Sequence, residues 1–230
     1  MTVMSNQAEA AAAGSQPRIR SYSARRGRLS PLTLDRLAAL GPSRAIPDGP
    51  LDAMATFGRV APLVLEIGCG HGGAAIGYAA THPHHDVLAV DVHPPGIARM
   101  LAAAQRCAVP NLRIVLDDGV NVLAERIAPQ HLAGLHMFFP DPWPKARHHK
   151  RRLVGPDLLD LAYRRLAPSG VIRIATDHAG YASHIRSVLS AGDRFAVTEG
   201  ERPAWRPMDG FEAKAKIAGP AVAEFTAVRR

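Results

Sequence analysis

The stretch LVLEIGCGHGG, residues 63–73, constrains the fold of this chain more than any other feature. Its first half predicts a short apolar strand over 63–67. Its second half fits the pattern G-x-G-x-x-G, with Gly68 and Gly70 as the first two glycines, and opens a helix near residues 71–81. Glycines at these places let the backbone turn tightly and approach a ligand. The stretch therefore predicts an α/β unit with a ligand crevice, and its pattern fits NAD, FAD and S-adenosylmethionine alike.

The alternation of strands and helices continues along the chain. Further strands are predicted at 86–91, 112–116, 135–139, 171–176, 195–199 and 223–228, and further helices at 31–40, 157–166, 179–190 and after residue 91. Strands that alternate with helices predict a parallel sheet covered on both faces. The last two strands follow each other without a long crossover helix, which predicts an antiparallel edge.

The helix after the second strand has one apolar face, whose residues are Ile97, Met100, Leu101, Ala104 and Ala108. Their spacing of three and four residues predicts that this face is buried. Cys107 borders the face and is expected to fill the core. Because the chain has 2 cysteines, it cannot form a disulfide framework, which fits a reducing cytoplasm.

Residues 1–30 differ in composition from the remainder. Residues 1–17 are rich in Ala, Ser, Gln and Gly and predict a disordered tail, whereas residues 18–30 form a basic arm with one aromatic residue, Tyr22. We therefore expect a flexible tail and arm over 1–30 and one folded domain over 31–230.

The net charge of +8 attracts polyanions such as nucleic acid or acidic membranes. No apolar run is long enough to span a membrane and the N-terminus lacks the features of a signal peptide, so we expect a cytoplasmic protein.

Acidic residues stand where the predicted strands end. Glu66 would repel the pyrophosphate of a dinucleotide but attract the ammonium and sulfonium groups of S-adenosylmethionine, unless it only caps local amides. Asp91 ends the second strand, where an acid can accept hydrogen bonds from both ribose hydroxyls, a feature that NAD enzymes share. Asp118 follows the third strand and could accept from an adenine amine. Asp117 competes for that place, and either residue could be a simple helix cap.

The stretch FFPDPWPKARHHKRR, residues 138–152, follows the fourth strand. Asp141 stands there between two prolines, which restrict the backbone and hold the carboxylate in place. Trp143 offers a stacking face for a base, and the basic run that follows suits a phosphate chain. Its five cations are Lys145, Arg147, Lys150, Arg151 and Arg152. The alternative is a rigid turn with a buried tryptophan.

Two groups of histidines invite a metal site: His82, His84 and His85, and then His148 and His149. The first group has no cysteine or carboxylate at ligand spacing, and the second lies within the cationic run. We therefore expect no metal.

Six stretches together resemble the bacterial tRNA (guanine-N7-)-methyltransferase family: LEIGCGHG, VDVH, DD, FFPDPWPKARHHKRR, ATD and RPMDGFE. The likeness runs from about Arg18 to the C-terminus, and the FPDPWPK stretch is its most specific part. It implies a Rossmann-like class I methyltransferase fold with a mostly parallel seven-stranded sheet. It also implies S-adenosylmethionine as methyl donor and guanine 46, in the variable loop of tRNA, as acceptor.

The resemblance also assigns residues to the two substrates. Carried over position by position, the residues that bind the cofactor or line its site are Glu66, Asp91, Asp118 and Asp141, beside Gly68 and Gly70 of the glycine loop. Those that contact tRNA are Lys145, Asp177, Asp209, Gly210, Phe211 and Glu212. The family usually has Thr-x-Phe-Glu at the last four positions, so Asp209 departs from its pattern.

The chemistry of guanine N7 suits this set of residues. N7 carries a lone pair and no proton, so no strong base is needed and alignment with the methyl group dominates catalysis. Asp141 is expected to stabilise the positive charge that reaches the purine, or to accept from its N–H groups.

Two other classes of protein compete with this interpretation. An NAD-dependent oxidoreductase shares the glycine loop but is disfavoured by Glu66, and a non-catalytic RNA-binding module leaves the acids unexplained. We expect a monomer.

Overall fold

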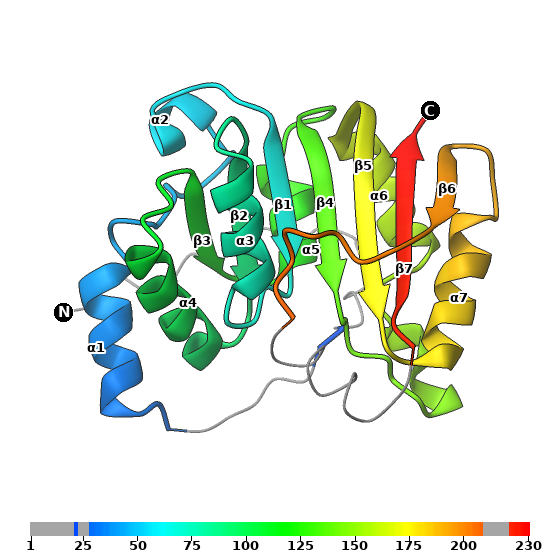
Figure 1. The fold of residues 1–230 in the computed structure, drawn as a ribbon, viewed down its shortest axis with the longest axis horizontal. Helices are drawn as coiled ribbons and strands as arrows, with labels where there is room; N and C mark the ends of the chain where they lie inside the picture. The colour runs from blue at the N-terminus through cyan, green and yellow to red at the C-terminus, as the bar shows by residue number, and fades with distance from the viewer. Residues whose placement is uncertain (1–20, 23–27, 209–220) are drawn as a thin grey trace, which may run out of the picture.

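The computed structural model describes residues 21–22, 28–208 and 221–230 (Figure 1). Within these residues seven strands form one sheet, in the order β3-β2-β1-β4-β5-β7-β6. The strands are β1 Leu63–Ile67, β2 Asp86–Asp91, β3 Leu112–Leu116, β4 Leu132–Phe138, β5 Leu166–Thr176, β6 Phe195–Glu199 and β7 Ala223–Arg229. The first five are parallel, whereas β7 pairs antiparallel with both β5 and β6. The predicted α/β sheet with an antiparallel edge is confirmed.

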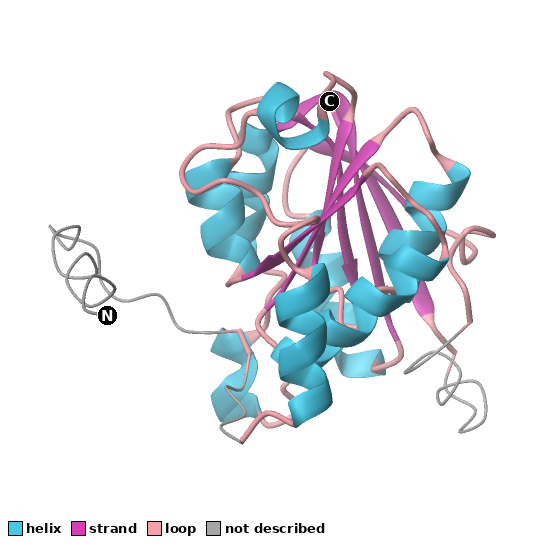
Figure 2. Cartoon of the chain, turned by 90° about the vertical axis from the view of Figure 1, so that its left-hand side faces the viewer, coloured by secondary structure: helices cyan, strands magenta, loops and turns pink. Residues whose placement is uncertain are grey.

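Helices cover both faces of this sheet (Figure 2). They are α1 Pro31–Leu40, α2 Ala53–Phe57, α3 Gly73–Thr81, α4 Pro94–Arg106, α5 Gly119–Asn121, α6 Pro156–Arg165 and α7 Ala179–Leu189, with a π-helical turn at Val122–Arg126 and a 3-10 segment at Ala146–Arg151. Alternate residues of β1 enter different cores, since Leu65 packs with α6 and α7 whereas Val64 packs with α3 and α4. Burial on both faces explains why the parallel strands are nearly continuous apolar runs.

Local sequence signals place the first helix correctly. Helix α1 begins at Pro31 after the cap Ser30, whose side chain accepts from the Thr33 N–H, and it ends before Gly41. Other boundaries differ from expectation. Strand β5 begins at Leu166, so the Ala-Pro-Ser-Gly stretch belongs to a strand that shifts register against β4, and α2 and α5 were not expected.

The predicted core role of Cys107 is wrong. Helix α4 buries four of the five residues of its predicted face, but it ends at Arg106. Cys107 then caps the helix and is exposed. Ala108 is also exposed and takes a left-handed φ of 50°, and this turn brings Val109 into the core instead.

The longest helix in the described part of the chain, α4, has 13 residues. A helix needs about 20 apolar residues to cross a bilayer, so none of the helices described here can do so.

Candidate active site at the carboxyl ends of the strands

The glycine loop after β1 exposes an open stretch of backbone. Gly68, Gly70 and Gly72 have φ values of 77°, 57° and 86°, a left-handed conformation that glycine adopts without steric cost. A Cβ atom on Gly68 or Gly70 would meet no atom within 4 Å, whereas one on Gly72 would collide with Met100. The loop is therefore packed against α4 on one side and open to a ligand on the other.

Asp91, at the end of β2, holds this loop in place. Its Oδ2 accepts from the Gly70 N–H at 2.7 Å, and its Oδ1 accepts from the His93 N–H at 2.8 Å. Each carboxylate oxygen has a second lone pair, so both can still accept from a ligand hydroxyl. The predicted ribose acceptor thus also shapes the backbone around the ligand.

Glu66 brings a second carboxylate to the same loop. It is 3% exposed and lies in register with Ala89 of β2 and His136 of β4. Burial raises the pKa of the neighbouring Cys69 thiol, and the charges of Asp91 and Glu66 raise that pKa further. Cys69 is therefore a neutral thiol rather than a nucleophile, and the negative potential that keeps it so favours a cationic ligand.

Asp118 fulfils the helix-cap interpretation. Its Oδ1 accepts from the Val120 N–H at 2.9 Å, at the start of α5, and the residue is 8% exposed. The exposed Asp117 accepts in turn from the Asp118 N–H at 2.6 Å. The cap accounts for one oxygen of the Asp118 carboxylate.

Asp141 is exposed in the turn that follows β4. The turn is built from two non-glycine residues with left-handed backbone, Phe139 at φ 53° and Trp143 at φ 43°. The Phe139 N–H donates to the Ala175 carbonyl of β5 at 2.8 Å. Such conformations cost on the order of 1–3 kcal/mol each and persist only where the surroundings impose them. The turn therefore presents the Asp141 carboxylate to solvent from a constrained backbone.

The five cations after Asp141 divide into two sets. Arg152 turns inward: its Nε donates to the Pro142 carbonyl at 3.0 Å, and its guanidinium lies 5.1 Å from the ring centroid of Tyr181. Burial raises the pKa of this tyrosine to about 12, so it stays neutral, and its hydroxyl accepts from the Val154 N–H. Arg151 also packs against the protein. The other three, Lys145, Arg147 and Lys150, are exposed.

Arg151 and Trp143 fix part of the N-terminal arm. The Arg151 guanidinium lies 3.9 Å from the Trp143 ring centroid and donates to the Tyr22 carbonyl at 3.1 Å. The Trp143 indole N–H donates to the Ser21 carbonyl at 2.9 Å. One face of Trp143 is therefore covered by Arg151, and the stacking of this residue on a base stays a prediction. The two hydrogen bonds place Ser21 and Tyr22 against Trp143 and Arg151.

The remaining predicted substrate residues are placed only in part. Lys145 directly precedes the 3-10 segment, and Asp177 directly follows β5. Both therefore lie, like Asp141, beyond the carboxyl ends of the strands. The segment Asp209–Glu212, with Gly210 and Phe211, lies outside the described residues.

The histidines of the 82–85 loop belong to an aromatic cluster. The His82 ring stacks on Tyr78 with centroids 4.0 Å apart, and the Tyr78 hydroxyl shares a hydrogen bond of 2.7 Å with His85 Nδ1. Tyr78 also meets His136 and Trp205 edge-on. In the part of the chain that the structure describes, no group of three or more His, Cys, Asp or Glu side chains could hold a metal ion.

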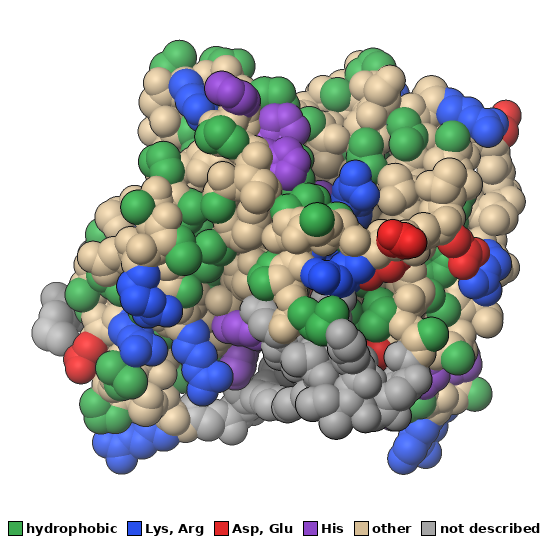
Figure 3. All heavy atoms as spheres, viewed as in Figure 1, with side chains coloured by type: hydrophobic (Ala, Val, Ile, Leu, Met, Phe, Trp, Pro, Cys, Tyr) green, Lys and Arg blue, Asp and Glu red, His purple; other side chains and the backbone are tan. Residues whose placement is uncertain are grey.

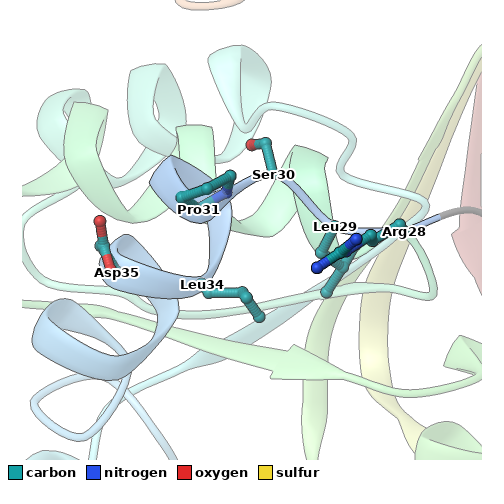
Figure 4. A pocket seen from close by; sticks show the side chains of 6 residues that line it. All are labelled: Arg28, Leu29, Ser30, Pro31, Leu34 and Asp35. Carbon is teal, nitrogen blue, oxygen red and sulfur yellow. The ribbon is translucent and has the colours of Figure 1, made fainter.

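A separate pocket of about 490 Å³ lies at the start of α1, between residues 28 and 35 (Figure 4). An adjoining pocket reaches α4 and is lined by three cations, Arg28, Arg36 and Arg99. Figure 3 shows several cationic side chains at the lower left of that view, where α1 and α4 lie. The first pocket is also lined by the Asp35 carboxylate, so it is the adjoining pocket, with its three arginines, whose charge suits an anion.

Sequence reasoning gave no role to Arg206. This residue is 2% exposed and contacts the Phe138 and Phe139 rings, next to the turn that carries Asp141. Its only sequence signal was its place in the RPMDGFE stretch. The inward turn of Arg151 and Arg152 was also missed, because charge alone does not tell a clamping arginine from a solvated one.

Comparisons with known proteins agree with this geometry. A family model described as "Putative methyltransferase" matches residues 60–224. A tRNA (guanine-N(7)-)-methyltransferase of Nocardia farcinica is 44% identical over 224 residues, which cover 91% of this chain and 83% of that protein. One of the same name from Nitrosomonas europaea is 42% identical over 94% of this chain and 98% of its own length.

Solved structures share the fold at low identity. The 16S rRNA methyltransferase KamB superposes with a TM-score of 0.52 and 12% identity, covering 81% of this chain and 99% of its own. A SAM-dependent O-methyltransferase from Thermotoga maritima gives a TM-score of 0.52 and 14% identity, over 74% of this chain and 60% of its own. The Rossmann-like methyltransferase sheet expected from the sequence is thereby confirmed.

Proposed function

The chain belongs to the tRNA (guanine-N7-)-methyltransferase family, and we propose that it transfers the methyl group of S-adenosylmethionine to N7 of guanine 46 in the variable loop of tRNA. The observation that carries this proposal is the set of groups gathered at the carboxyl ends of the strands. There an open glycine loop with two carboxylates adjoins a constrained turn that presents Asp141, with exposed cations beyond it. Family membership sets aside the NAD-dependent oxidoreductase and the non-catalytic RNA-binding module.

The residues at the glycine loop fit S-adenosylmethionine. When bound, it supplies an electrophilic methyl group on a sulfonium. Gly68 and Gly70 leave space for it, because Cβ atoms there would enter open volume. Asp91 has acceptor capacity for the ribose hydroxyls, and Glu66 contributes negative charge beside the loop. Asp118 completes the set, with one oxygen committed to the cap of α5.

Asp141 is proposed as the catalytic carboxylate. N7 attacks through its lone pair, so no proton has to leave before the methyl group moves. Positive charge then appears on the purine, and a fixed carboxylate nearby lowers the energy of that state. Asp141 is exposed, and the flanking prolines and the left-handed Phe139 restrict the backbone that carries it.

The exposed cations are proposed to hold the tRNA backbone. Lys145 follows Asp141 closely enough to contact the nucleotide at the reacting base, and Asp177 lies at the same edge. Asp209, Gly210, Phe211 and Glu212 remain part of the proposed tRNA site. The pocket lined by Arg28, Arg36 and Arg99 supplies a second cationic surface, beside α1 and α4.

The organisation and location of the protein belong to the same proposal. We infer a tail and a basic arm over residues 1–30 that serve the domain over 31–230, supported by the contacts of Ser21 and Tyr22 with Trp143 and Arg151. A tRNA substrate implies that the enzyme works in the cytoplasm.

A methyl-transfer assay tests this function. The protein is incubated with S-adenosylmethionine labelled on its methyl group and an unmodified tRNA transcript, and the product is digested to nucleosides. Label in 7-methylguanosine is the expected result. A transcript with adenine in place of guanine 46 is the control and should take up no label. Label at another position of the tRNA would contradict the proposed site, and no transfer at all would contradict the proposed function.

A further inference from the structure

Arg206 lies where three parts of the molecule meet. The segment that follows β6, residues 200–208, runs back across the sheet in front of β5 and β4 (Figure 1). Arg206 stands near its end, shortly before Asp209 in the sequence. It is 2% exposed, which is rare for an arginine and requires partners for its charge.

A glutamate in β7 holds the guanidinium in one plane. Arg206 Nη1 donates to Glu224 Oε2 at 3.0 Å, and Nη2 donates to Glu224 Oε1, so the pair is a two-pronged fork. Glu224 lies in register with Ala175 of β5, the residue whose carbonyl accepts from the Phe139 N–H. The arginine is therefore anchored to the same strand pair that supports the turn after β4.

The guanidinium of Arg206 also contacts the two aromatic residues at the start of that turn. Its central carbon lies 4.6 Å from the Phe138 ring centroid and 5.6 Å from that of Phe139. Cation–π contacts of this kind strengthen when water is excluded, as it is around Arg206. Phe139 has the left-handed φ of 53°, and only Pro140 separates it from Asp141.

The segment that carries Arg206 is itself firmly seated. The Trp205 ring stacks on His136 with centroids 5.4 Å apart. A Cβ atom on Gly77 of α3 would lie 2.4 Å from the Trp205 carbonyl oxygen, so the helix backbone touches the segment directly. The position of Arg206 is thus fixed from both sides.

We propose that Arg206 is a positioning residue for the methyl transfer, which holds Asp141 in place through Phe138 and Phe139. This inference rests on the proposed function and adds a residue to it that touches neither substrate. Its contribution is the direction of the Asp141 carboxylate, not a charge at the reacting base.

The test compares Arg206→Lys and Glu224→Gln with a matched pair elsewhere. Both changes remove the fork but keep the size of the side chains. Arg186 and Glu199 form a second fork, with donor–acceptor distances of 2.5 and 2.7 Å, on α7 and β6. It does not touch the turn after β4, so Arg186→Lys is the control. Turnover is measured at saturating S-adenosylmethionine and unmodified tRNA, below the unfolding temperature of every variant.

Arg206→Lys and Glu224→Gln are each expected to lower kcat, by up to about 10²-fold, which is the cost of a misplacement near 1 Å. Arg186→Lys is expected to leave kcat unchanged. Phe139→Leu should lower kcat too, and combined with Arg206→Lys it should add little, because both act through one contact.

The outcomes separate this inference from the proposed function. An inactive wild-type protein would contradict the function itself. If the wild type is active, a normal kcat in folded Arg206→Lys would overturn the positioning role. So would an effect confined to the KM for tRNA, or losses that multiply independently with Phe139→Leu. If Arg206→Lys does not fold, kcat is compared in the same way for Phe139→Leu, Glu224→Gln and the double variant.

Discussion

The loops at the carboxyl ends of the strands are built in two opposite ways. Around the glycine loop, carboxylates accept from backbone N–H groups, as Asp91 does from Gly70 and His93. Around the turn after β4, arginines donate to backbone carbonyls, as Arg152 does to Pro142 and Arg151 to Tyr22. The first half is shaped by anions and the second by cations.

This difference follows the charges of the two substrates. A cationic methyl donor is favoured by the negative potential of the groups that shape its loop, and an anionic RNA is favoured by the positive potential of the groups that shape the other. The same side chains can therefore hold the backbone and attract the ligand. Asp141 is the exception, because it is an acid presented from the cationic half, where positive charge is expected to develop on the base.

That exception predicts the largest effect. Asp141→Asn keeps the shape of the side chain and removes its charge, and we expect kcat to fall by about 10²–10³-fold while the protein still folds. Turnover at saturating substrates measures it. The exposed acid Asp157, at the start of α6, provides the control, since Asp157→Asn should have normal turnover. Near-normal turnover in folded Asp141→Asn would remove the exception and leave the cationic half purely a binding surface.

The anionic half predicts the next effect. Asp91→Asn turns one acceptor oxygen into a donor that faces a backbone N–H, and we expect the Kd for S-adenosylmethionine to rise about 10- to 100-fold, given about 1.5–3 kcal/mol for charged hydrogen bonds. Isothermal titration measures this change. Asp117→Asn should leave Kd within a factor of a few, because Asp117 is exposed and its carboxylate accepts from the neighbouring Asp118 N–H. Equal effects of the two changes would show that loop geometry matters less than total charge.

His136, which lies between the two halves, predicts that the free energy of unfolding depends on pH. His136 of β4 lies in register with Glu66 on one side and Arg173 on the other. Burial, followed by the charge of Arg173, lowers the His136 pKa from 6.5 to about 3. The folded protein keeps this ring neutral, while the unfolded chain takes up a proton below pH 6.5. Stability is therefore present above that pH and is lost as the pH falls, by about 2 kcal/mol between pH 7 and pH 5.

Urea unfolding at the two pH values tests this expectation. His136→Phe retains a ring beside Trp205 but cannot take up a proton. Between pH 7 and pH 5 its free energy of unfolding should therefore fall by about 2 kcal/mol less than that of the wild type. The exposed His84 gives the control, since His84→Asn should keep the wild-type pH dependence. If His136→Phe keeps the full dependence, other groups carry it.

The smallest effect is expected from an exposed cation. Lys150→Met should reduce the slope of log Kd against log salt by about 0.7–0.9, the share of one phosphate contact, and leave kcat unchanged. Binding to unmodified tRNA over a salt series measures it. Arg152→Met should do the reverse, because Arg152 holds Pro142 rather than RNA, and lower kcat with an unaltered slope. A loss of slope in both variants would mean that the two sets of cations act alike.

Backbone periodicity and glycine placement were sufficient to predict the sheet and the glycine loop that we propose as the site of the methyl donor. Residues such as Gly68 and Asp91 act through local backbone, so their spacing along the chain carries the information. Arg206 and Glu224 act across the sheet, and no spacing predicts a fork between the segment after β6 and β7. Cys107 was misjudged for a similar reason, because the left-handed turn at Ala108 that ends α4 has no strong local signal.

Strand β7 has a consequence for the order in which the protein is completed. It comes last among the described strands in the chain, yet it lies between β5 and β6 and carries the glutamate that holds Arg206. On a ribosome, the sides of β5 and β6 that pair with β7 must therefore stay unpaired until β7 emerges, and such edges invite aggregation. A nascent chain that stops before Ala223 would keep the glycine loop proposed for the methyl donor, but it would lack Glu224, which we propose to act on Asp141 through Arg206. Premature termination is therefore expected to impair turnover more than donor binding.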